Sequence, residues 1–260
     1  MHKITLVCSI HRENGLCNAG ELLKILRAIE PDVVFEEMLP SDFDSYYRLG
    51  TKSNLESQAI TRYREFKSFR QVPVDRYDMP ENLLAEIKRG FDCVCDRVEQ
   101  TSQEYRELKE EQDNRADQFG FTYLNSVAFA ATMARTSEIE EKTIIETGDQ
   151  GLIRGLERWR HAIQKRELEM IHNIYQYCRK NVFDIGVFLV GAAHKTGIVK
   201  EIEKHAGTEA DLINWNFTLI GTLPTMAKSL RGHLTSNSSG QPGWRRLQLN
   251  WTLGGTSGVP

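Results

Sequence analysis

Two histidines and several carboxylates are the side chains with which this 260-residue chain could do chemistry. Each follows a segment that reads as a β-strand. They are His11, Glu36, Glu37, Asp75, Asp78 and His194. Two imidazoles and one to three carboxylates in one place can bind a divalent metal with an open coordination position, or can position a water as general base and acid. Spacing along the chain does not choose between these two chemistries.

The elements around the first of these residues predict a parallel βαβ unit. Residues 3–11 read as a strand, residues 21–29 as an amphipathic helix, and residues 33–35 as a second strand. Strands joined by a helix in under 40 residues run parallel. Ligands bind beyond the carboxyl ends of such strands, where the loops diverge. We therefore expect His11 and one of the two glutamates at the same edge of the sheet.

The rest of the chain predicts an α/β fold with a mixed, mostly parallel central sheet flanked by helices, and with a large helical insertion between its two halves. A third short strand is expected over residues 71–78, a strand buried on both faces over residues 183–190, and an edge strand within residues 211–220. We expect one domain: residues 1–80 as the first half of the core, 81–180 as a helical insertion or cap, 181–234 as the second half, and 235–260 as a mobile tail.

Apolar stripes within the insertion predict three helices. They lie over residues 84–98 with a charged continuation to 117, over residues 121–131, and over residues 163–178. On the third helix, Glu167 falls near the centre of the apolar face and Arg166 toward its edge. A carboxylate there needs a partner, and an arginine, a metal or a substrate would serve. The alternative to a role in the site is an ion pair with a purely structural role.

Each candidate also has an interpretation without catalysis. A histidine at a strand end is often a hydrogen-bonded loop residue, and Asp75 and Asp78 are suitable turn formers. The segment from Gly191 to His194 aims the imidazole at the sheet edge, or else only packs a strand against a helix. Since side chains alternate along a strand, we expect at most one of Glu36 and Glu37 to point at the site, and the other to cap a helix or meet solvent.

Composition narrows the class of protein. Thirty-three basic and 36 acidic side chains give a net charge of -3, so we expect no nucleic-acid partner. The longest apolar run, residues 185–193, is about half of the ~20 residues that a membrane-spanning helix needs, and no apolar leader is present. We therefore expect no membrane association and a cytoplasmic location. Five scattered cysteines predict reduced, structural thiols.

The motifs occur in a recognisable order. A strand ends in a histidine (His11) and is followed by a helix, after which a Pro-Asp-Val-Val segment (residues 31–34) precedes a glutamate (Glu37). Further along, an Arg-acid pair lies on a helix (Arg166 and Glu167, with Met170), and a Val-Gly-Ala-Ala-His segment (residues 190–194) is followed by Gly197 and Ile198. Over residues 3–38 and 160–204 the chain thus resembles the TraB/PrgY and Tiki superfamily, which also includes the erythromycin esterases and ChaN-like proteins. It departs from the family pattern in lacking the first motif's glycine, and in having Glu167 where Asp or Asn is more familiar.

This resemblance implies an α/β core with acidic residues and histidines in one cleft. Some relatives are described as metal-dependent proteases, and others as hydrolases that use a histidine-activated water. Asp75 matches an acidic residue that some branches carry after the third strand. We then expect His11, Glu37 and His194 to hold a metal or a water, Asp75 or Glu167 to act as further acid or base, and Arg166 to stabilise an oxyanion.

The expected function is therefore a TraB/Tiki-like hydrolase that cleaves a peptide or ester bond of a small-molecule or peptide substrate. The expected cofactor is a divalent metal ion (Mn, Zn, Co or Ni), with no nucleotide or organic cofactor. The alternative is a non-catalytic binding or regulatory protein with the same fold, which the missing glycine would suit. The helical insertion could be a lid, a homo-oligomer interface or a partner-binding arm. The membrane-spanning tail of many relatives is missing, which favours a free cytosolic form.

Overall fold

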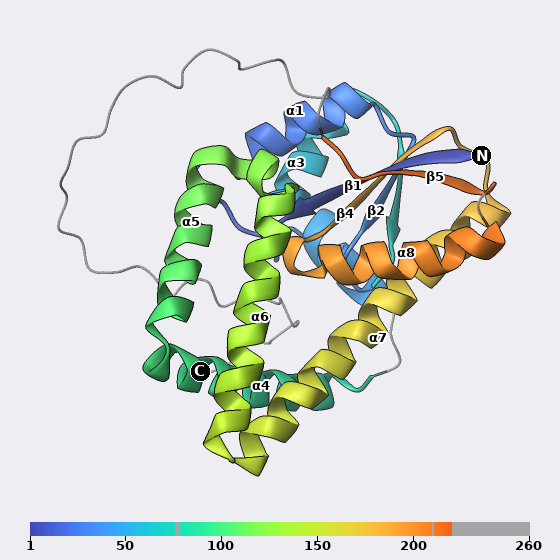
Figure 1. Ribbon diagram of the computed structural model, residues 1–260. Helices are drawn as coiled ribbons and strands as arrows, with labels where there is room; N and C mark the ends of the chain where they lie inside the picture. The colour runs from blue at the N-terminus through green and yellow to red at the C-terminus, as the bar shows by residue number, and fades with distance from the viewer. Residues whose placement is uncertain (76–78, 210, 220–260) are drawn as a thin grey trace, which may run out of the picture.

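The computed structural model describes residues 1–75, 79–209 and 211–219. Within these residues, five strands form one parallel sheet in the order β3-β2-β4-β1-β5 (Figure 1). The strands are β1 (His2–Ser9), β2 (Val33–Glu36), β3 (Arg70–Pro73), β4 (Ile185–Gly191) and β5 (Ile213–Asn216). The predicted α/β class is confirmed, and the described sheet is parallel throughout. The predicted tail from residue 235 and Asp78 lie outside the described residues.

The two strongest predicted strands lie side by side in the centre of this sheet. β1 and β4 pair in parallel from Lys3 with Ile185 to Ser9 with Gly191. Both strands are almost entirely buried, as their continuous apolar sequence indicates. Because their carboxyl ends meet at one edge, the residues after Ser9 and after Gly191 become neighbours although more than 150 positions separate them in the sequence.

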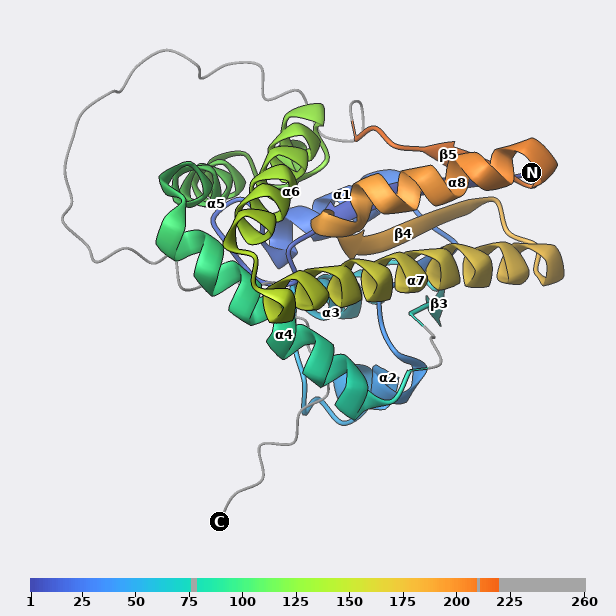
Figure 2. The same ribbon diagram turned by 60° about the horizontal axis from the view of Figure 1, so that its bottom comes forward.

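Helices cover both faces of the sheet (Figures 1 and 2). α1 (Ala19–Ile29) and α3 (Leu55–Tyr63) pack against each other on one face, and α7 (Gln150–Lys180) and α8 (Lys195–Glu209) on the other. This division follows from right-handed crossovers, since the chain moves toward β3 through α1 and α3 and toward β5 through α8. A short turn, η1 (Pro40–Asp42), and α2 (Phe43–Tyr47) join β2 to α3, and η2 (Ala192–His194) joins β4 to α8.

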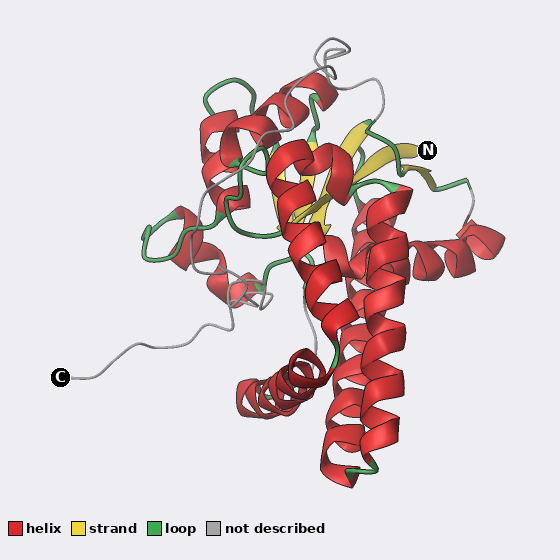
Figure 3. Ribbon diagram, turned by 60° about the vertical axis from the view of Figure 1, so that its left-hand side comes forward, coloured by secondary structure: helices red, strands yellow, loops and turns green. Residues whose placement is uncertain are grey.

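A helical arm lies beyond the carboxyl edge of the sheet (Figure 3). We use this name for α4 (Glu81–Thr101), α5 (Gln103–Leu124), α6 (Val127–Thr147) and the first half of α7, which pack on one another. The arm has its own small apolar core, formed by Val94, Val98, Tyr105, Ile139, Ile144 and Leu156. α7 is long enough to run from this core back along the sheet, so one helix belongs to both parts. No described helix is long and apolar enough to cross a membrane.

Two of the predicted helix boundaries in the arm are wrong. The charged residues to 117 do not continue the first helix, because Ser102 interrupts it and its side chain accepts from the Tyr105 N–H to begin α5. The stripe over residues 121–131 is divided between α5 and α6, and Val127 is 85% exposed. The break serves packing: the Asn125 side chain exchanges two hydrogen bonds with the backbone of Cys8, where β5 no longer covers β1.

Candidate active site

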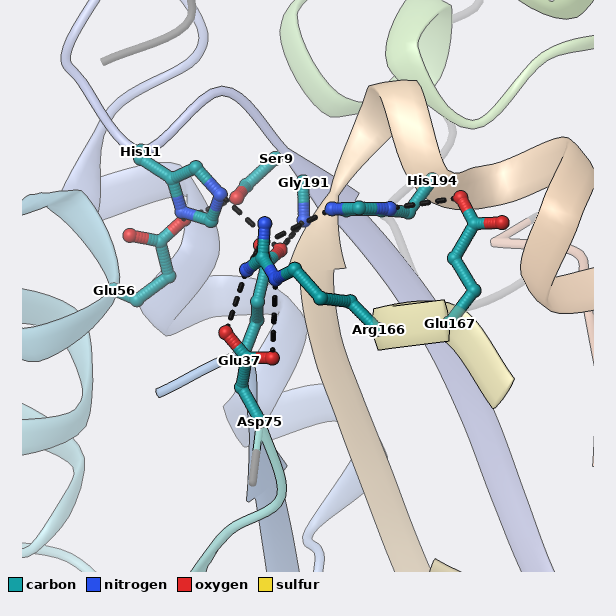
Figure 4. Close-up of polar contacts among 9 residues, drawn as sticks. All are labelled: Ser9, His11, Glu37, Glu56, Asp75, Arg166, Glu167, Gly191 and His194. Atoms are coloured by element: carbon teal, nitrogen blue, oxygen red, sulfur yellow. Dashed lines mark hydrogen bonds and ion pairs between the residues drawn. The ribbon is translucent and has the colours of Figure 1, made fainter. Parts of the chain in front are cut away.

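His11 follows β1 and lies between two buried carboxylates (Figure 4). Its Nε2 is 3.3 Å from Glu37 Oε2, and its Nδ1 is 3.1 Å from Glu56 Oε1. The backbone of His11 is left-handed, with φ of 56°, a conformation that costs a non-glycine residue free energy. This turn directs the imidazole back over the sheet edge.

Glu37 is the centre of the cluster, and both its oxygens are engaged. Oε1 accepts from Arg166 Nη2 at 2.9 Å and lies 3.2 Å from His194 Nε2. Oε2 accepts from the Gly191 N–H at 2.7 Å and faces His11. One carboxylate from the end of β2 therefore joins the histidines of both halves of the chain. The expected convergence of His11, Glu37 and His194 is present in the structure.

The remaining predicted residues surround this centre. Arg166 binds Asp75 through Nε at 3.2 Å and Nη2 at 2.5 Å, while Glu167 Oε1 lies 2.8 Å from His194 Nδ1. Arg166 and Glu167 are adjacent on α7 and both are buried, at 6% and 7% exposure. The contact of Glu167 is thus with His194, a partner that the sequence analysis did not name, while Arg166 binds Asp75 and Glu37.

Two glycines provide room for these side chains. A Cβ on Gly191 would lie 2.8 Å from His11 Nε2 and 3.2 Å from Glu37 Oε2. A Cβ on Gly197 would overlap the carboxylate of Glu167. Since contacts under about 3 Å between such atoms are repulsive, any side chain at either position would displace a member of the cluster. The glycines of the Gly-Ala-Ala-His segment and of α8 therefore have a steric role at the site.

Sequence reasoning missed two members of the cluster, Ser9 and Glu56. The Ser9 hydroxyl and His11 Nδ1 both face Glu56 Oε1, while Glu56 Oε2 is buried with no hydrogen-bond partner among the described residues. Glu56 lies in the first turn of α3, where the helix dipole stabilises a carboxylate. The capping box of Asn54 and Ser57 was an available signal for the start of α3, but it does not indicate that Glu56 is buried.

Proximity shifts the pKa values of the cluster. Burial alone would lower the pKa of each histidine, but Glu56 and Glu37 raise that of His11 well above its usual value, and Glu37 and Glu167 raise that of His194. Burial opposes ionisation of Glu37, yet His194 and His11 hold its pKa well below the usual value. His11 likewise lowers the pKa of Glu56 against burial. The cluster thus favours charged imidazoles between charged carboxylates.

Asp75 behaves differently, because burial raises its pKa although Arg166 counteracts this. Burial also raises the pKa of the nearby Cys8 and Cys17 thiols to about 12. Both thiols are therefore protonated near neutral pH and are unsuited to act as nucleophiles.

Glu36 points away from the cluster, as the alternation along β2 predicts. It does not cap a helix or meet solvent, however, so that part of the prediction is wrong. Its side chain is 3% exposed, accepts from Gln71 Nε2 at 2.7 Å, and is bonded by the Tyr47 hydroxyl. Burial raises its pKa to about 7. The second glutamate is therefore a buried, separately hydrogen-bonded group.

The predicted metal ligands do not form a ready metal site as they are placed. The described residues contain no group of three or more His, Cys, Asp or Glu side chains arranged to hold a metal ion. The arrangement gives a reason, because both Glu37 oxygens already face donors: Oε1 accepts from Arg166 and Oε2 accepts from the Gly191 N–H. The metal prediction therefore stays a prediction.

Comparison of the chain with protein-family models, curated proteins and solved structures finds no match. The resemblance to the TraB/PrgY and Tiki superfamily is thus neither supported nor opposed by these comparisons. The geometry of the cluster carries the functional argument.

Proposed function

We propose that the chain is a hydrolase of peptide or ester bonds in which His11 and Glu56 move the protons. The observation that carries the proposal is the position of His11. Its imidazole lies between two buried carboxylates, its backbone is held in a left-handed conformation, and at 17% its side chain is more exposed than those of Glu37, Glu56 and His194. Strained backbone at a titratable residue in a buried polar cluster is typical of active sites.

The proton path begins at Glu56. Its free Oε2 can accept a hydrogen bond from a water, and Oε1 lies 3.1 Å from His11 Nδ1. The water oxygen attacks the substrate carbonyl while its proton passes to Glu56. His11 gives its proton to the leaving group from Nε2 and is recharged from Glu56 through Nδ1. The proton taken from the water thus ends on His11, and both residues return to their starting charge.

The other members hold this pair in its reactive form. Glu37 keeps His11 and His194 charged, and Glu167 orients the His194 ring through Nδ1. The Nε and Nη2 groups of Arg166 bind Asp75 and Glu37, which favours a role in positioning these carboxylates over the expected role at an oxyanion. His194 is engaged in the same way, by Glu167 at Nδ1 and by Glu37 at Nε2, which favours a positioning role for it as well.

The test is a hydrolysis assay with p-nitrophenyl esters and internally quenched peptides. We expect His11→Gln and Glu56→Gln each to lower kcat/KM by about 100-fold or more, the effect typical of losing a general acid or base. The matched controls are His172→Gln, which changes an exposed histidine of α7, and Glu65→Gln, which changes an exposed glutamate just after α3. Circular dichroism checks that each variant is folded.

The metal route is separated in the same assay. Each reaction is run with a chelator, and with Mn, Zn, Co or Ni added. Activity that survives the chelator supports the proton path, whereas activity that needs one of the metals supports the His11, Glu37 and His194 metal site. If folded parent protein hydrolyses no member of the panel under any of these conditions, the hydrolase proposal fails and the non-catalytic binding protein becomes the better explanation.

A further inference from the structure

A cavity of about 240 Å³ lies within the helical arm and reaches the catalytic cluster at one end. At that end it is lined by Glu167, Ala193 and His194. From there it follows α7 back to Leu156, a length of about 16 Å at a rise of ~1.5 Å per residue. The cavity therefore leads from His194, whose Nε2 lies 3.2 Å from Glu37 Oε1, into the part of the chain that the α/β core does not need.

The walls of this cavity are mainly apolar. The rings of Phe91 and Trp159 stack at 4.7 Å between α4 and α7, and Met133, Leu156 and Ile163 add aliphatic surface. Ligand sites usually combine such walls with a few polar groups, and those that enclose a whole drug-sized ligand measure about 300–1,000 Å³. At about 240 Å³ this cavity suits one substituent of a substrate.

Apart from Lys109, which lies over the Tyr105 ring at 5.8 Å, the charged groups that line the cavity have polar partners, and this favours an uncharged occupant. Lys88 is paired with Asp92 at 2.9 Å, and Arg160 is paired with Glu141 at 2.9 Å. Toward the tip of the arm, the buried Tyr105 donates its hydroxyl hydrogen to Glu140 Oε1 at 2.9 Å, and burial raises the pKa of Glu140. A charged substituent would have to displace these contacts, whereas an apolar group would only replace water.

We propose that this cavity is the specificity pocket of the site, and that it holds an uncharged aromatic or branched aliphatic substituent of the substrate next to the bond that is cleaved. Cleavage next to the pocket rests on the proposed hydrolase function. Binding of the substituent is independent of that function, because the pocket is formed by residues outside the proton path. α7 connects the two, since Ile163 lines the pocket one turn before Glu167 contacts His194.

The first measurement is binding without turnover. Calorimetry with 1-butanol and 4-phenyl-1-butanol tests whether the pocket takes an aromatic group, and we expect the phenyl compound to bind at least about tenfold more tightly. Ile163→Trp fills the pocket and should abolish this preference. Ile145→Trp, a change at a position of α6 that is 59% exposed and outside the cavity lining, should retain it. Gln164→Trp, at the exposed rim of the cavity, is the second variant if Ile163→Trp does not fold.

The second measurement is hydrolysis of p-nitrophenyl acetate and p-nitrophenyl 3-phenylpropanoate. We expect the parent to favour the aromatic acyl group by about tenfold in kcat/KM, and the pocket-filling variant to lose this preference while it still cleaves the acetate. Equal affinity for both alcohols, or a preference that Ile163→Trp leaves unchanged, overturns the pocket. Selective, Ile163-dependent binding by a protein that hydrolyses nothing retains the pocket and refutes the hydrolase proposal instead.

Discussion

Replacing Gly191 with alanine tests whether the contact between His11 and Glu37 depends on the end of β4. The new methyl group would lie 2.8 Å from His11 Nε2 and 3.2 Å from Glu37 Oε2, so it enters the space between the imidazole and β4. The backbone N–H of Gly191 donates to the same Glu37 oxygen. Because β4 is buried and paired on both sides, the His11 ring is the part that can move.

The size of the effect follows from the distance. At 3.3 Å and an effective dielectric constant of ~20 the attraction between charged His11 and Glu37 is about 5 kcal/mol, and moving the ring by ~1 Å removes about 1 kcal/mol of it. The overpacked methyl group adds a cost of about 1–3 kcal/mol. We therefore expect Gly191→Ala to lower the free energy of unfolding by about 2–4 kcal/mol. The pKa of His11 should fall toward its usual value, because Glu37 is one of the two groups that raise it.

Urea unfolding and an NMR titration of the His11 ring measure these two effects. The control is Gly186→Ala on the same strand, where the three atoms nearest the added methyl group are apolar atoms of Phe183, Ile4 and Phe35 at 3.1 to 3.4 Å. It should reduce stability while leaving the His11 titration unchanged. If Gly191→Ala titrates like the parent, His11 and Glu37 are not in the contact on which the proton path depends.

Two further changes test other parts of the structure. Burial raises the pKa of Glu36 from 4.5 to about 7, so folding favours its protonated form and stability is lost as pH rises between those values, by about 3 kcal/mol in all. Glu36→Gln should therefore be up to about 3 kcal/mol more stable than the parent above pH 7 and about as stable as the parent near pH 4. Urea unfolding midpoints measured across this pH range test the prediction. A stability difference that does not change with pH would contradict it. Asn125→Ala should remove two hydrogen bonds to Cys8, at a cost of about 1–3 kcal/mol, and should speed hydrogen exchange at the Cys8 amide. The control is Asn181→Ala, which removes a hydrogen bond at the end of α7 and should leave hydrogen exchange at the Cys8 amide unchanged.

The fold and the centre of the site were predictable because they depend on local patterns and one topological rule. Continuous apolar strands with short crossovers specify a parallel sheet, and parallel strands bring the residues after their carboxyl ends to one edge. This was sufficient to bring His11, Glu37 and His194 together. The helix wheel was sufficient to bury Glu167, because a carboxylate on an apolar face requires a partner.

The missed features depend on contacts between distant segments. Glu56 reaches His11 because α3 packs beside α1, and nothing in residues 39–63 alone specifies that packing. The break at Asn125 is similar, since its reason is the uncovered backbone of Cys8 on another element. Ser102 carries a local capping signal, but the charged residues around it continue the helical pattern and conceal the break.

α7 is longer than the α/β core requires, and a function of the arm would explain the extra length. The last half of α7 would be enough to cover the sheet, yet the helix continues into the arm, where Trp159 and Ile163 line the cavity. One turn later the same helix provides Arg166 and Glu167, which contact Glu37, Asp75 and His194. A helix is stiff over this distance, so a group that fills the cavity bears on the element that holds the charged cluster. Under the proposed function the arm is thus part of the site, and variants that fill the cavity should change which substrates are cleaved before they change the fold.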